Sequence, residues 1–136
     1  MAEKDMIGKL AIYAFIAGIV IAIIFGLFHA WTIGQGETPF FETDNGGWVA
    51  WLLAVIGVIV GVLAFMGKGT ITAKEVPAFL LAGIALLVMY GTFENITIKP
   101  AIGTLLKSIS LPLAIFIVPA VGILAIKAIW DIGKEV

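Results

Sequence analysis

The side chains that could carry chemistry are few, and they lie where long apolar runs begin or end. Lys107 and Ser108 stand at the start of the last apolar run, where an ammonium and a hydroxyl could bind an anionic lipid headgroup or a phosphate. The other interpretation is an interfacial break beside a lysine that extends toward water. His29, the only histidine, follows the first run and is expected to be a polar anchor rather than a ligand or pH sensor. Lys127 and Asp131 are expected to form a weak exposed ion pair.

Oxygen ligands gather in one polar segment, which contains Glu37, Glu42, Asp44 and Asn45. Carboxylate and amide oxygens suit Ca²⁺, but their spacing here matches no calcium-binding loop, so a solvated turn is favoured. The chain has no cysteine, which excludes disulfides, thiol redox chemistry and cysteine-ligated metals. We therefore expect no metal, no cofactor and no catalytic residue.

The apolar runs also argue against several classes of membrane protein, because none has an ionisable side chain near its middle. Proton-coupled antiporters and proton-carrying rotor subunits need a carboxylate within the membrane. Bis-haem cytochromes need pairs of histidines, and quinone-linked thiol oxidoreductases need cysteines. No nucleophile, base and orienting group stand in a recognisable arrangement. The sequence therefore predicts a protein that is not an enzyme.

Membrane helices must position these side chains. Hydrophobic residues make up 62% of the chain and charged residues only 12%, which is too little charge for a water-soluble domain. About 20 apolar residues in a helix cross the ~30 Å hydrocarbon core of a bilayer. We predict an all-α integral membrane four-helix bundle forming a single domain over residues 1–136. Its helices are expected at about 7–29, 48–66, 73–93 and 111–131, with a polar outer loop at 32–47.

The final apolar segment is too long for one straight span. It is interrupted by Lys107, Ser108, Ser110 and Pro112, so residues 100–109 are predicted to form a short interfacial or re-entrant segment. The helix that follows is predicted to kink at Pro119, because a proline inside a helix removes a backbone hydrogen bond.

Lysine placement predicts the orientation, since cytoplasmic flanks of membrane helices are rich in basic residues. With both termini in the cytoplasm, that side holds Lys4, Lys9, Lys68, Lys74, Lys127 and Lys134, and the other side holds Lys99 and Lys107. We therefore expect a multi-pass protein of the plasma membrane with cytoplasmic termini. The sequon that begins at Asn95 would then lie outside, where glycosylation could reach it.

Small residues recur along the predicted helices, as they do where membrane helices pack closely. We predict helix-packing faces, which we call the first and second stripes, at Ala14, Gly18, Ala22 and Gly26 and at Gly57 and Gly61. We expect these two stripes to face each other within one protomer. Similar residues recur at Ala78, Ala82 and Ala85 and at Gly122, Ala125 and Ala128.

The helix with Gly57-Val58-Ile59-Val60-Gly61, followed by Ile71-Thr72-Ala73-Lys74-Glu75-Val76-Pro77-Ala78-Phe79-Leu80, resembles a pattern in small uncharacterised four-helix membrane proteins, mostly archaeal. In that pattern a Gly-x-x-x-Gly helix ends in an "ITEKEV-x-x-FL" connection. Here Ala73 replaces the first acid and Pro77 stands one position early. The resemblance implies an archaeal source and no particular activity.

We expect a non-enzymatic structural or assembly protein that packs as a homo-oligomer or as an accessory subunit of a larger membrane complex. Its expected partners are membrane lipids and other membrane subunits. A net charge of −1 gives no sign of a nucleic-acid partner. The alternative is a small oligomeric channel or transporter without an intramembrane carboxylate, with its pore near Pro112 and Pro119.

Overall fold

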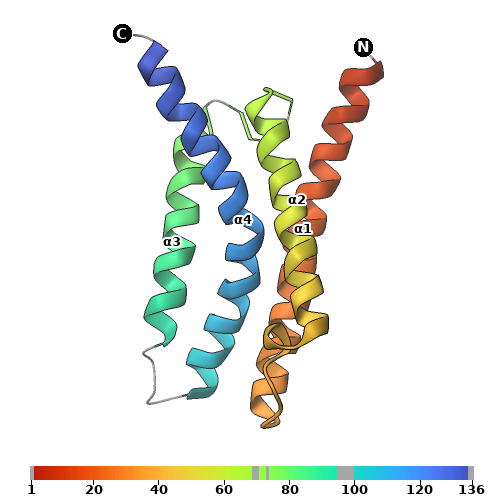
Figure 1. Ribbon diagram of the computed structural model, residues 1–136, viewed down its shortest axis with the longest axis vertical. Coiled ribbons are helices and arrows are strands. Elements are labelled where there is room, and N and C mark those ends of the chain that lie inside the picture. The colour runs from red at the N-terminus through yellow and green to blue at the C-terminus, as the bar shows by residue number, and fades with distance from the viewer. Residues whose placement is uncertain (1, 69–70, 73, 95–99, 135–136) are drawn as a thin grey trace.

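The computed structural model describes residues 2–68, 71–72, 74–94 and 100–134. These residues form helix α1 (Ala2–Gly34), the short 3-10 helix η1 (Phe40–Glu42), and helices α2 (Asp44–Phe65), α3 (Val76–Glu94) and α4 (Pro100–Lys134). The four long helices run side by side, with both termini at one end of the bundle and the α1–α2 connection at the other (Figure 1). The prediction of an all-α four-helix bundle is confirmed, and each helix is long and apolar enough to cross a membrane.

The α1–α2 connection is shorter than the predicted loop at 32–47, because both flanking helices extend into it. Gly36 ends α1 with a φ of 74°, and the Glu37 N–H donates to the Thr32 carbonyl at 3.0 Å. This is the geometry of a helix that stops at a left-handed glycine. At the other side, the Thr43 hydroxyl accepts a hydrogen bond from the Gly46 N–H at 3.1 Å and caps α2.

Helix α3 begins at Val76 rather than at 73 as predicted. Pro77 is therefore its second residue, and the first turn of a helix tolerates proline because its N–H groups have no partner within the helix. Ala73 and the sequon at Asn95 lie outside the described residues.

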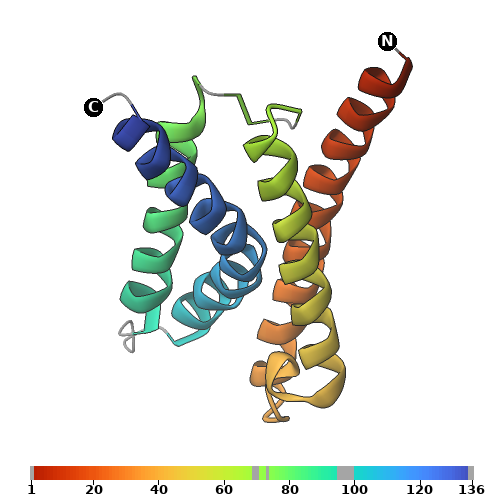
Figure 2. The ribbon, with the colours of Figure 1, turned by 45° about the horizontal axis from the view of Figure 1, so that its top comes forward.

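Helix α4 corrects the prediction of a separate interfacial or re-entrant segment, because residues 100–134 form one continuous helix of 35 residues. Pro112 removes a single hydrogen-bond donor, and the Ser108 carbonyl that it leaves without a helical partner packs against Gly26 of α1. The helix bends near its middle, in the stretch that holds Pro112 and Pro119 (Figure 2). The long segment is thus accommodated by one bent helix rather than by two separate pieces.

The same helix lies at the centre of the bundle. Helices α1, α2 and α3 each pack mainly against α4, and the contact between α1 and α2 is smaller. Phe116 of α4 is the largest fully buried side chain. The other buried residues of the core cluster are Ala22, Leu53, Val60, Ala64, Ile71, Ala120 and Leu124.

The first stripe faces α4 rather than the second stripe. A β-carbon placed on Gly18 would overlap the Phe116 ring, and one placed on Gly26 would lie 2.8 Å from the Ser108 carbonyl oxygen. Ala22 between them is fully buried, and Ala14 is half-buried. The expectation that the two stripes face each other is therefore wrong.

The second stripe faces α4 as well. A β-carbon on Gly57 would overlap the Phe116 carbonyl, and one on Gly61 would lie 2.8 Å from the Ala120 Cα. Both glycines thus allow the backbone of α4 to come close to α2. Because apolar side chains gain little from leaving lipid, such close backbone contact is a main source of attraction between membrane helices.

The remaining small residues behave differently from the two stripes. On α4, a β-carbon on Gly122 would meet no atom within 4 Å. On α3, Gly83 is covered by the Val121 side chain of α4. Ala78, Ala82 and Ala85 of α3 are exposed on the surface of the protomer. We call them the α3 outer face.

The close approach of α4 at Gly57 predicts that alanine substitutions at Gly57 and at Gly122 will change the stability of the protein by very different amounts. We expect Gly57→Ala to lower the free energy of unfolding by about 1–3 kcal/mol, because the new methyl group meets a backbone carbonyl that cannot turn aside. Gly122→Ala, in open space, is the control and should leave stability unchanged or slightly higher. Unfolding in mixed micelles titrated with dodecyl sulfate measures both. Equal effects at the two positions would contradict the assignment of Gly57 to the helix interface.

Candidate functional site

The α1–α2 connection folds back onto the end of α1 through two side chains. The Thr32 hydroxyl donates to the His29 carbonyl at 2.8 Å and accepts from the Phe40 N–H at 3.1 Å. The His29 Nδ1 accepts from the Phe41 N–H at 3.0 Å. Both side chains are buried. These bonds satisfy backbone donors that would otherwise be unpaired at a membrane boundary, where leaving them so is costly.

Aromatic rings hold the same connection from its apolar side. Phe40 stacks on Phe25 with ring centroids 5.4 Å apart and meets Phe28 edge-on at 4.9 Å. Phe41 lies 5.2 Å from the His29 ring. His29 is therefore a polar anchor, as expected, and its partner is a backbone N–H of the connection.

A cavity of about 340 Å³ lies beside this anchor. Four polar side chains line it, each from a different element: His29 from α1, Glu42 from η1, Tyr90 from α3 and Lys107 from α4. Tyr90 was not among the residues expected to form a site. The one signal for it is that α3 ends and α4 begins within a few residues, which brings a polar aromatic residue near Lys107.

The two residues predicted to contact a lipid headgroup are separated by the structure. Lys107 lines the cavity, with its Nζ 5.3 Å from the centroid of the Tyr90 ring. Ser108 is only 1% exposed, and its carbonyl lies against α1 at Gly26. Adjacent residues of a helix point about 100° apart, so one faces the cavity while the other faces α1. Ser108 is not accessible to a lipid. Its hydroxyl is buried without a hydrogen-bond partner in the structure.

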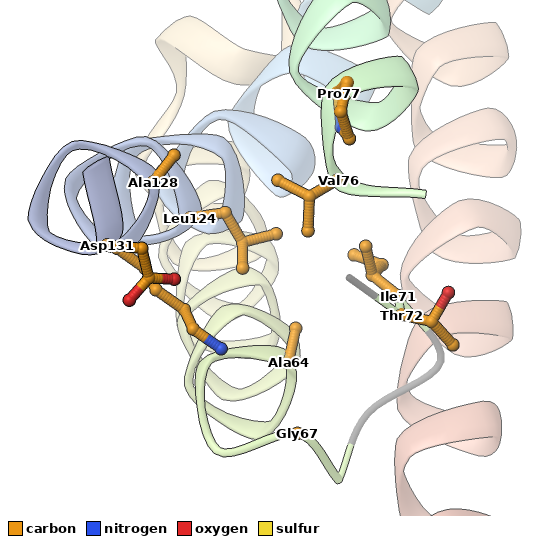
Figure 3. Close-up of a pocket in the computed structure, with 10 residues that line it drawn as sticks. Ala64, Gly67, Ile71, Thr72, Val76, Pro77, Leu124, Ala128 and Asp131 are labelled. Atoms are coloured by element: carbon orange, nitrogen blue, oxygen red, sulfur yellow. The ribbon is translucent and has the colours of Figure 1, made fainter. Parts of the chain in front are cut away.

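The opposite end of the bundle has a second cavity of about 480 Å³ (Figure 3). Leu124, Val76 and Ile71 point toward one another across it. Lys127 lines it too, and its Nζ donates to the Phe65 carbonyl at the end of α2, at 3.0 Å. The structure has this hydrogen bond in place of the expected ion pair between Lys127 and Asp131. The bond stabilises helix α2, because it places a cation near the negative end of the helix dipole.

The acidic residues of the polar segment do not converge. Glu42 belongs to η1, Asp44 and Asn45 begin α2, and Glu37 lies between the helices with an exposed side chain. Within the residues that the structure describes, no group of three or more histidine, cysteine, aspartate or glutamate residues could hold a metal ion.

The fold and this distribution of polar groups define an integral multi-pass membrane protein, an all-α four-helix bundle whose polar side chains gather at its two ends. Comparison with known proteins found no matching family model, and no matching curated protein or solved structure.

The anchoring role of Thr32 can be tested by removing its hydroxyl without changing its shape. Thr32→Val leaves the Phe40 N–H without a partner, and we expect it to lower the free energy of unfolding by about 1–3 kcal/mol. Thr38→Val alters an exposed threonine of the same connection and serves as the control. Thermal unfolding in mild detergent measures both, and limited proteolysis should cut the connection faster in the Thr32 variant alone. An unchanged Thr32 variant would mean that this bond does not hold the connection.

Proposed function

We propose that this protein is a non-enzymatic assembly protein of the plasma membrane that packs with copies of itself. Both termini would lie in the cytoplasm. Support for this orientation comes from Lys68, Lys127 and Lys134, which belong to the end of the bundle that holds the termini. An accessory role in a larger membrane complex is the related expectation, in which a different subunit takes the place of the second copy.

The α3 outer face is the observation that carries the proposal. Helices α1 and α2 use their glycines inside the protomer, against α4. Helix α3 uses Gly83 in that way, but its Ala78, Ala82 and Ala85 are exposed on the surface of the protomer. Small side chains at this spacing allow two helices to approach closely in lipid, and two copies of one such face are complementary to each other.

The interior of the protomer favours this proposal over conduction through a single copy. The two end cavities are separated by a core of apolar side chains, among them Leu53, Phe116 and Leu124, each at most 1% exposed. Among the described residues that form this core, none is ionisable. A channel built between several copies stays a prediction, and ion flux in liposomes tests it.

The absence of native cysteine makes the assembly testable by cross-linking in membranes. Ala82→Cys places one thiol on the α3 outer face, and we expect mild oxidation to give a disulfide-linked dimer. Ile84→Cys is the matched control, since Ile84 is 55% exposed on the same helix but lies about 160° around its axis from Ala82. It should give little dimer.

The outcomes separate the alternatives. Equal cross-linking at the two positions would indicate random collisions, and no cross-linking at Ala82, with a monomeric mass in mild detergent, would contradict self-assembly. A cross-link from Ala82 to a different protein would assign the α3 outer face to another subunit of a larger complex.

A further inference from the structure

We propose that the cavity beside His29 binds the headgroup of a membrane lipid that carries a phosphodiester and a primary ammonium, as in phosphoethanolamine lipids. The inference is independent of the α3 outer face, because it concerns a cavity formed within one protomer at the end of the bundle. It rests on the charges that line the cavity, on the orientation of His29, and on the groove next to it.

The cavity presents one cation and one anion from different elements. Lys107 of α4 can hold a phosphate, and Glu42 of η1 can accept hydrogen bonds from an ammonium. The two side chains have opposite charges, so the cavity offers one group for each end of a ligand that has both signs.

His29 adds a directed donor. Because its Nδ1 accepts from the Phe41 N–H, the neutral ring carries its proton on Nε2. The bond also fixes the plane of a buried ring that lines the cavity. Its Nε2–H can therefore donate to a phosphate oxygen together with the Lys107 ammonium.

The same arrangement selects a primary ammonium over a choline group. A quaternary ammonium has no N–H for Glu42 and is usually bound on aromatic faces. The Tyr90 ring already makes a cation–π contact with Lys107, whose Nζ lies 5.3 Å from the ring centroid. Glu42 is then the group that remains for the amine, and a primary ammonium is what it can bind by hydrogen bonds.

The space around the cavity suits the rest of a lipid. Ile33 lines the cavity and also lines an apolar groove of about 580 Å³ between α1 and α4, formed with Leu27, Trp31 and Leu105. The groove is open on the outer surface, where Trp31 is 53% exposed. Tryptophan is typical of the headgroup level of a bilayer. A headgroup in the cavity can thus extend its hydrocarbon chain into the groove.

Native mass spectrometry of the full chain tests the proposal. The protein is exchanged into micelles with equal amounts of phosphatidylethanolamine, phosphatidylglycerol and phosphatidylcholine, and the retained lipids are counted. We expect phosphatidylethanolamine to be retained about tenfold over each of the others, the difference expected from one or two charge-assisted hydrogen bonds. Lys107→Gln and Glu42→Gln should each reduce this preference to near parity.

Matched controls use charges outside the cavity. Lys134→Gln removes a lysine from the other end of the same helix, and Glu37→Gln removes an exposed acid from the same connection. Both should keep the preference. Ala50→Leu, which fills the cavity without changing its charge, should abolish it and provides a second test if a charge variant does not fold.

Several results would overturn the proposal. Equal retention of phosphatidylglycerol, or a Glu42→Gln variant with unchanged preference, would remove the role of the ammonium. Retention that survives both Lys107→Gln and Ala50→Leu would place the lipid elsewhere on the protein. Displacement of the bound lipid by soluble glycerophosphoethanolamine at equal concentration would overturn its assignment as a membrane lipid.

Discussion

The approach of α4 to the glycines of α1 and α2 is the contact on which the rest of the bundle depends. In a bilayer, apolar side chains are solvated by lipid, so helices are held by dispersion and polar contacts where their backbones come close. Gly26 and Gly57 allow this because they leave space for the Ser108 and Phe116 carbonyls. Phe116 then fills the interior of the bundle. A side chain at either glycine would push the helices apart, and in lipid no hydrophobic effect would bring them together again.

The polar side chains that form hydrogen bonds between segments, unlike the glycines, are concentrated where the helices end. Thr32 and His29 bind backbone donors of the α1–α2 connection, and Lys127 binds the last turn of α2. Each therefore has a structural role before any ligand is considered. The cavity beside His29 is unusual because Glu42 and Lys107 also face it. The molecule thus combines an apolar core with one end that has directed donors and an acceptor, which is the basis for the proposed headgroup site.

The membrane class, the number of helices and the small-residue faces of α1 and α2 were predictable, because charge-free apolar runs and glycine spacing are local properties of the chain. Which helix meets which is a tertiary property, and the glycines of α1 and α2 gave no indication that both would face α4. The helix does not break near Pro112 as expected. A proline there removes one backbone hydrogen bond, and the packing of α4 against α1 can offset that loss. Ser108 was misplaced for a related reason, since its burial depends on α1. Tyr90 joins the cavity only through the packing of α3 on α4.

The central place of α4 has a consequence for how the protein is made. Helices α1, α2 and α3 precede α4 in the chain and leave the ribosome first, yet each packs mainly against α4. Until α4 is inserted, the glycines of α1 and α2 lack the helix that they contact in the bundle, and α3 lacks its main partner. The three earlier spans must therefore stay together in the membrane as a loose group, and the fourth converts them into a bundle. The contacts that define the bundle can therefore form only once the fourth helix is in place.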